Sequence, residues 1–138
     1  MTKHCPGCDL RGARLIGADL QEANLKAANL STANLSEANL QGSNLIAATL
    51  EQTDLSLSNL THASLVDANL DRANLSGGSL IKTDLQNATL KQSNLLFADL
   101  QGANLLDTTL TDTQLPDRLL QEGQQPENKQ PTLDFNIQ

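Results

Sequence analysis

Leucine stands at every fifth position of this chain, from Leu10 to Leu120, without exception. Two places before each leucine stands a small residue, most often alanine, and only Arg118 departs from that second column. All other charged residues in this stretch therefore fall on the remaining three positions of the five-residue word. Because a period of five matches neither common element of secondary structure, it limits the fold more strongly than any other feature of the sequence.

A straight helix or strand cannot place these leucines on one face. Five residues advance an α-helix by about 500°, so successive leucines would point around all sides. In a strand, side chains alternate between two faces, and an odd spacing turns every second leucine outward. We therefore expect a bend in every word. The small residue and the leucine point inward from a short extended segment, the residue between them points outward, and the last two residues turn a corner. Repetition of this word makes a solenoid with every leucine inside.

The glycines agree with this register, because they fall at the second corner residue, two places after the leucine column. Six glycines stand there: Gly7, Gly12, Gly17, Gly42, Gly77 and Gly102. A turn residue with positive φ favours glycine. The outward position between the two inward columns is rich in Asn and Asp, as suits residues beside turns, although Thr49, Ser64 and Thr89 also stand there.

The repeated word A-[DN]-L-x-x, as in Ala18-Asp19-Leu20, Ala23-Asn24-Leu25 and Ala33-Asn34-Leu35, resembles the pentapeptide-repeat family over residues 8–115. The resemblance implies an all-β fold, a right-handed quadrilateral β-helix of four words per coil and about five to six coils. Bending and closure follow from the period, whereas the number of sides comes from the resemblance alone. The resemblance also implies a cyanobacterial type of protein with a non-enzymatic role.

The solenoid needs caps, and four segments are expected on this basis. Residues 1–7 form an N-terminal cap segment and residues 8–115 the β-helix. Residues 116–123, which begin with proline and end with glycine, form a short C-terminal helical or turn-like cap that uses Leu119 or Leu120. Residues 124–138 form a flexible tail. Its alternating Leu133, Phe135 and Ile137 also fit a strand that packs on the rod or on a neighbouring molecule. A homodimer that forms through an end cap or through the tail is a further alternative.

The composition of the chain limits the classes of partner and the cellular location that we expect. The formal net charge is -7 and the isoelectric point is near 4.5, which disfavours nucleic acid and anionic membranes as partners. The sequence contains no apolar run long enough for a membrane span and no secretory signal at its start. With only two cysteines, we expect a cytoplasmic protein and no disulfide-built scaffold.

The two cysteines form the motif CPGC at Cys5 and Cys8. Such spacing suggests redox or metal chemistry. However, Cys5 falls in the leucine column and Cys8 in the small-residue column, so the register favours two small buried hydrophobes. A disulfide or redox pair and a metal site are the alternatives. Since His4 is adjacent but His62 lies near the middle of the rod, a fourth zinc ligand is lacking, and no cofactor is expected.

Apolar side chains at outward positions predict a partner surface. With twenty residues per coil, Ile46, Val66 and Leu106 share one column, Leu57 and Phe97 share another, and Leu96 adjoins Phe97. Exposed apolar residues on a polar rod are typical of protein-binding surfaces. The alternative is a scatter of ordinary surface hydrophobes.

No constellation of residues supports catalysis, since no nucleophile is paired with a base and no carboxylate pair lies in an apolar setting. An interior filled with Leu and Ala also leaves little space for a ligand. We therefore expect no enzyme, but a structural or interaction module that presents a rigid polar rod to an unidentified protein.

Some members of the family resemble acidic rods that occupy the DNA site of a type II topoisomerase. The alternative function is therefore a DNA-mimicking acidic rod that binds such an enzyme. The chain contains a stretch without Lys or Arg, between Lys26 and Arg72, with the acids Glu37, Glu51, Asp54, Asp67 and Asp71. It departs from those members in its length, in its leucine-only inner column and in lacking a projecting loop. One of its stacked columns also mixes both signs of charge.

Overall fold

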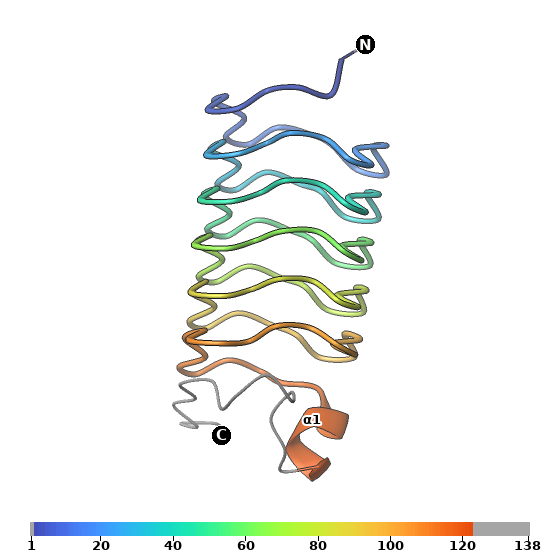
Figure 1. Cartoon of the computed structure of the whole chain (residues 1–138), viewed down its shortest axis with the longest axis vertical. Coiled ribbons are helices and arrows are strands. Elements are labelled where there is room, and N and C mark those ends of the chain that lie inside the picture. Colours follow the sequence, from blue (N-terminus) through green and yellow to red (C-terminus); the bar gives the residue numbers. More distant parts are fainter. Residues whose placement is uncertain (1, 123–138) are drawn as a thin grey trace.

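The computed structural model describes residues 2–122, which form a four-sided rod of stacked coils (Figure 1). The residue between the two inward columns pairs in parallel with the residue twenty positions later, from His4 with Asn24 to Asn94 with Gln114. Twenty residues are four words, so one coil has four sides and consecutive coils stack in register. The β-structure therefore consists of isolated bridges, one per side and coil, over between five and six coils. Among the described residues, the one helix is α1, Asp117–Glu122.

In words that have a coil on both sides, four of the five backbone N–H groups bond to backbone carbonyls. The N–H groups of the leucine and of the second corner residue donate to the next coil, and that of the outward residue donates to the previous coil. The N–H of the small residue closes the corner by donating to the preceding leucine. In the word that follows Asn34, these N···O distances lie between 2.7 and 3.0 Å.

The fifth N–H, that of the first corner residue, explains the preference for Asn and Asp. In most words the Oδ1 atom of the outward Asn or Asp accepts it, as Asn34 does from Ser36 at 3.0 Å and Asp54 from Ser56 at 3.0 Å. This local bond satisfies a group that the stacked coils do not reach, and buried or half-buried backbone groups need such a partner. The side chain of the outward Asn or Asp, between the small residue and the leucine, therefore completes the hydrogen bonding of the backbone.

The interior contains the two inward columns, as predicted from the period. The every-fifth leucines from Leu30 to Leu85 are less than 2 % exposed, and each stabilises the rod by about 2 kcal/mol through burial. Threonines in the small-residue column use their hydroxyl groups, since Thr53 Oγ1 donates to the Leu30 carbonyl at 2.8 Å and Thr83 repeats this with Leu60 at 2.7 Å. The buried hydroxyl group of Ser58 has no such partner.

Each corner contains a left-handed residue. All second corner residues from Gly7 to Asp112 have φ between 55° and 72°, so the register inferred from the glycines is confirmed. Sixteen of these residues are not glycine. A left-handed conformation costs an L-residue about 1 kcal/mol, which the leucine core and the stacked coils must offset.

The ends differ in part from the sequence prediction. The β-helix begins before residue 8, because His4 already pairs with Asn24, so residues 3–7 form its first side and corner instead of a separate cap. At the other end α1 follows the buried Pro116, and the half-buried Leu119 packs against the core. The predicted tail 124–138 lies outside the described residues. Within those residues no helix has the length and apolar character needed to cross a bilayer.

We expect Leu60→Asp and Asn59→Asp to separate the inward from the outward positions. Leu60 is fully buried, so a carboxylate there should destabilise the fold by more than about 4 kcal/mol. The same residue at position 59 points outward and can still accept the N–H of Thr61, as Asn59 does at 3.0 Å, so its effect should stay within about 0.5 kcal/mol. Urea unfolding measures both, and equal tolerance of both changes would contradict the assignment.

Ser58→Ala should stabilise the protein by about 1 kcal/mol, because it removes a buried hydroxyl group without a partner. Thr53→Ala, at the same position of a neighbouring word, should destabilise it by about 1–2 kcal/mol, because it removes a hydrogen bond and a buried methyl group. Urea unfolding of both variants gives the two signs. A loss of stability in Ser58→Ala would mean that the serine hydroxyl group is bonded.

Candidate functional site

The four-sided coil sorts the predicted surface residues into two groups. Leu57, Leu96 and Phe97 lie on one corner of the rod, which contains residues 16–17, 36–37, 56–57, 76–77 and 96–97. Ile46, Val66 and Leu106 lie on another corner, two sides away. The two groups are therefore diagonal to each other and cannot contact one compact partner surface together.

Exposure separates the two groups further. Phe97 is 84 % exposed and Leu57 63 % exposed, whereas Ile46, Val66 and Leu106 are half-buried. The reason is the position in the word: the second corner residue points into solvent, whereas the first corner residue in the middle coils packs against its neighbours in the stack. In the first coil the first corner residue is exposed as well. Leu96, also a first corner residue, is half-buried as well.

Sequence reasoning missed one member of this corner. Ile16 is 54 % exposed and stacks in the same column as Leu96, four coils earlier, so counting in steps of twenty would have found it. We call Ile16, Leu57, Leu96 and Phe97 the apolar corner, and Ile46, Val66 and Leu106 the Val66 corner.

Leu57 and Phe97 are the two most exposed residues of the apolar corner. Gly77 stands between them in the same column, and a Cβ atom placed on it would lie 2.8 Å from Leu57 Cδ2. The leucine side chain therefore lies over the glycine, toward the coil of Phe97. Two coil spacings separate Leu57 from Phe97, about 10 Å. The result is a short apolar strip along the rod.

Both residues of this strip have a costly backbone conformation. Leu57 has φ 58° and Phe97 has φ 64°. Every corner of the rod requires this conformation, but it is uncommon for a bulky residue. Phe97 contributes little burial in return, because most of its ring is exposed. The stability of the isolated rod therefore gives no reason for a phenylalanine at this position.

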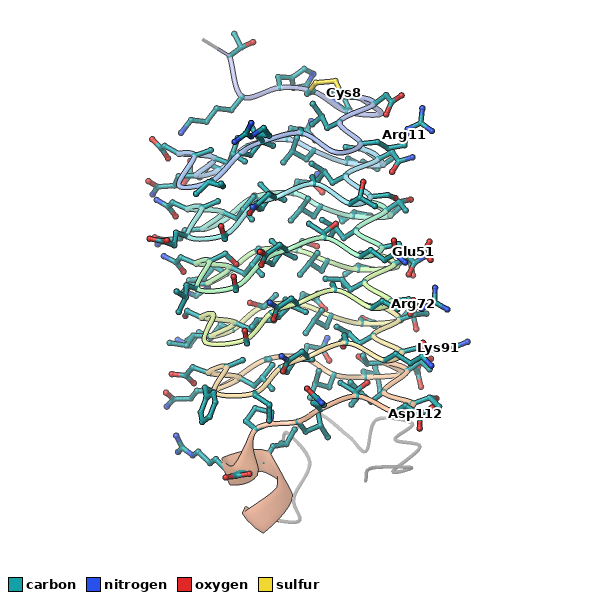
Figure 2. The ribbon with its side chains drawn as sticks, turned by 180° about the vertical axis from the view of Figure 1, so that it is seen from behind. Cys8, Arg11, Glu51, Arg72, Lys91 and Asp112 are labelled. Atoms are coloured by element: carbon teal, nitrogen blue, oxygen red, sulfur yellow. A yellow bond between two sulfur atoms is a disulfide. The ribbon has the colours of Figure 1, made fainter. Side chains whose placement is uncertain are left out.

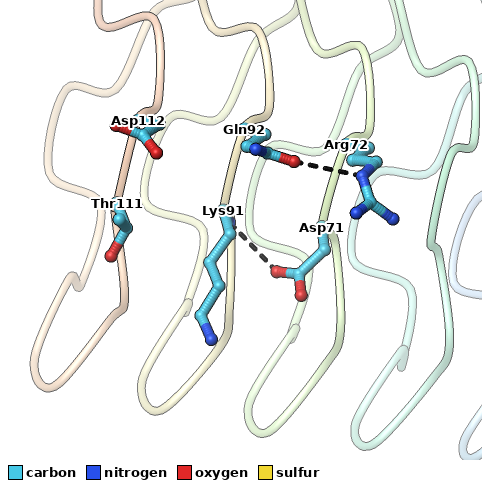
Figure 3. Close-up of a pocket in the computed structure, with 6 residues that line it drawn as sticks. All are labelled: Asp71, Arg72, Lys91, Gln92, Thr111 and Asp112. Atoms are coloured by element: carbon cyan, nitrogen blue, oxygen red, sulfur yellow. Dashed lines mark hydrogen bonds between the residues drawn. The ribbon is translucent and has the colours of Figure 1, made fainter.

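A polar hollow lies on the neighbouring corner, which we call the charged corner (Figure 3). It is lined by Asp71, Arg72, Lys91, Gln92, Thr111 and Asp112. Figure 2 shows Arg11, Glu51, Arg72, Lys91 and Asp112 along this edge of the rod, with both signs of charge mixed.

The groups of this hollow are used to join coils. Arg72 donates to Gln92 Oε1 at 3.1 Å and to Glu51 Oε1 at 3.2 Å. Asp71 Oδ1 accepts the Lys91 backbone N–H at 3.0 Å, in a word that has threonine where others have Asn or Asp. Within residues 2–122 there is no group of three His, Cys, Asp or Glu side chains placed to hold a metal ion. The hollow is therefore explained by coil stacking.

The cysteines at the N-terminal end are joined. Sequence analysis favoured two separate buried thiols, but the structure has a disulfide between Cys5 and Cys8 around the first corner (Figure 2). The motif brings the leucine position and the next small-residue position together across one corner, and both residues are half-buried. Disulfides persist mainly in oxidising compartments. The cytoplasmic location expected from composition stays a prediction.

An ion pair follows this disulfide in the first coil. Arg11 binds Asp9 through two bonds, Nε to Oδ1 at 2.8 Å and Nη2 to Oδ2 at 2.7 Å. These bonds lower the pKa of the Asp9 carboxyl group to about 2. The carboxylate form is therefore retained well into the acidic range at this end of the rod.

Reduction of the disulfide should loosen only the first coil. The bridge closes a loop of four residues, so the chain-entropy model gives a stabilisation of about 2 kcal/mol. With a phosphine reductant we expect faster hydrogen exchange at the backbone N–H groups of Leu10 and Leu15 and unchanged exchange at Leu70. The double variant Cys5→Ala/Cys8→Ala should not respond to the reductant, and a uniform loss of protection along the rod would contradict local action.

Comparison with known proteins relates this rod to one family of repeat proteins. A family model described as Pentapeptide repeats matches residues 8–45, 38–77 and 79–115. No curated protein matches the sequence significantly. Among solved structures, HetL of the cyanobacterium Nostoc sp. strain PCC 7120, described as involved in heterocyst differentiation regulation, is 30 % identical with a TM-score of 0.81. That match covers 83 % of this chain and 52 % of HetL, so the chain spans about half the length of that protein.

Two further structures bear on the fold. Rfr23 of the cyanobacterium Cyanothece 51142 is 30 % identical with a TM-score of 0.80, and the match covers 82 % of this chain and 91 % of Rfr23. QnrB1, a plasmid-mediated fluoroquinolone resistance protein, is 21 % identical with a TM-score of 0.52, over 81 % of this chain and 60 % of QnrB1. The likeness to QnrB1 concerns the fold alone. The predicted right-handed quadrilateral β-helix is confirmed by these matches.

Proposed function

This chain belongs to the pentapeptide-repeat family, and we propose that it is a non-catalytic interaction module that binds a protein partner through its apolar corner. A structural or interaction role fits a repeat protein whose interior is filled by leucine side chains. The finer part of the proposal, the use of one corner as the docking surface, rests on the apolar strip of Leu57 and Phe97.

Phe97 is the observation that carries this proposal. It is the most exposed large apolar side chain of the described residues, and its backbone is left-handed. Both properties are unfavourable in the isolated rod. Burial of a phenylalanine against a partner stabilises a complex by about 2–3 kcal/mol, and aromatic residues are enriched at protein interfaces. A binding partner thus supplies the free energy that the folded monomer does not gain from this residue.

The geometry gives less to the DNA-mimic alternative. The five acids of the stretch without Lys or Arg lie on different parts of the rod. Glu37 lies on the corner of Phe97, Asp67 on the Val66 corner and Asp54 on one side. Glu51 and Asp71 lie on the charged corner, where Glu51 pairs with Arg72 at 3.2 Å. A mimic of the DNA backbone needs a continuous row of negative charge, and this distribution does not form one.

Phe97→Asn tests the proposal because stability and binding should change in opposite directions. Asparagine tolerates the left-handed conformation, so the free energy of unfolding should stay the same or rise by up to about 1 kcal/mol. Capture of partner proteins from the native host on the immobilised variant should be lost. Thermal unfolding and mass spectrometry of the captured proteins measure the two effects.

Two controls accompany this variant. Gln92→Asn makes the same kind of change at the same position of the word on the charged corner, and we expect it to leave capture intact. Val66→Lys places a charge on the diagonal corner. If Val66→Lys abolishes capture while Phe97→Asn does not, the apolar corner is the wrong surface.

A further inference from the structure

We propose that the partner segment bound by the apolar corner is basic as well as apolar, a stretch of protein in which lysine or arginine alternates with apolar side chains. This inference rests on the proposed function and adds the chemistry of the partner to it. It follows from where the rod places its charges.

The half of the rod around the apolar corner contains no basic residue over four coils. This half consists of the corner and its two flanking sides, residues 33–40, 53–60, 73–80 and 93–100. Its charged residues are Glu37, Asp54 and Asp99. All basic residues between positions 26 and 91 lie on the other half: Lys26, His62, Arg72, Lys82 and Lys91. The net charge of the chain is thus unevenly distributed around the rod.

The three acids surround the apolar strip. Glu37 stands in the column of Leu57, one coil earlier. Asp54 lies on the side that leads into the corner and Asp99 on the side that leaves it, two residues after Phe97. None of the three takes part in the ion pairs that residues 2–122 form, which join Lys3 with Asp19, Arg11 with Asp9 and Arg72 with Glu51. The strip therefore has a rim of negative charge without a cation at its side.

An apolar strip with an acidic rim favours some partner segments over others. A basic segment is attracted by the rim, and its apolar side chains can cover Leu57 and Phe97, whereas an acidic segment is repelled. Charges of this kind act over about 10 Å at moderate ionic strength, which is about the length of the strip. A second copy of the chain is a poor occupant, because a symmetric contact through this corner would bring the same acids of two protomers together.

Removal of the rim charges gives a matched pair of variants. Glu37→Gln/Asp54→Asn/Asp99→Asn removes three negative charges and keeps the local acceptors, since other words have Asn at the positions of Asp54 and Asp99. Glu22→Gln/Asp67→Asn/Asp84→Asn removes the same charge elsewhere on the rod. Both triple variants should unfold at nearly the same denaturant concentration as the unchanged protein, so any difference in binding reports on position.

The experiment uses a displayed library of random peptides, selected on the full-length oxidised protein and counter-selected on Phe97→Asn. We expect the enriched peptides to have a net positive charge and at least one large apolar residue. Their affinity, measured by fluorescence anisotropy with the synthetic peptides, should fall about fivefold to tenfold in the rim variant. It should change less than about twofold in the control variant, and high salt should reduce the difference.

The other outcomes are decisive as well. Enriched peptides that are neutral or acidic, or that bind the rim variant as tightly as the unchanged protein, would overturn the basic partner. If such peptides still lose binding on Phe97→Asn, the proposed function itself survives. If no peptide survives the counter-selection and the captured proteins bind Phe97→Asn equally well, both proposals are removed. A library without any enrichment contradicts the basic partner, and so does a concentration-dependent dimer that Phe97→Asn abolishes in sedimentation, because the occupant would then be a second copy.

Discussion

The hydrogen bonds between stacked coils are the interaction on which the rest of this structure depends. Each side contributes a single bridge residue per coil, so no side is a conventional strand. The rod nevertheless has a partner for each N–H in a typical word, because three N–H groups reach neighbouring coils, one closes the corner and one is accepted by the outward Asn or Asp. Each coil can bury its leucines only while its neighbours are in place, so stability is shared along the rod.

This hydrogen bonding gives the second corner position an unfavourable backbone conformation but leaves its side chain unconstrained. The second corner residue must be left-handed, yet its side chain points into solvent and has no part in the core. Glycine or a small polar residue suits it best, as at Gly42 or Asn87. Leu57 and Phe97 are the only large apolar residues at this position within residues 2–122. Both stand at the same corner, and Gly77 between them leaves the space that Leu57 fills. A departure from the local rule in one place is the kind of feature that function explains and folding does not.

The distribution of charge also distinguishes the apolar corner from the charged corner. Basic and acidic groups are mixed on the charged corner, where they connect consecutive coils and explain the hollow there. Around the apolar corner the acids stand without such partners among the described residues. The rod therefore has one edge whose acids pair with basic groups of neighbouring coils, and another whose acids have no basic partner within residues 2–122.

The sequence by itself determined which residues point inward, because a charge-free column of leucine with period five permits only a bent, closed chain. It also indicated the left-handed corners through the glycines, and the family resemblance supplied four words per coil and hence the columns. Only the tertiary structure decided how far each outward residue is exposed, since stacking half-buries Val66, a first corner residue, and leaves Phe97, a second corner residue, in solvent. It also decided that Cys5 and Cys8 are joined, because the two columns in which they stand approach each other across a single corner, a distance that spacing along the chain does not reveal.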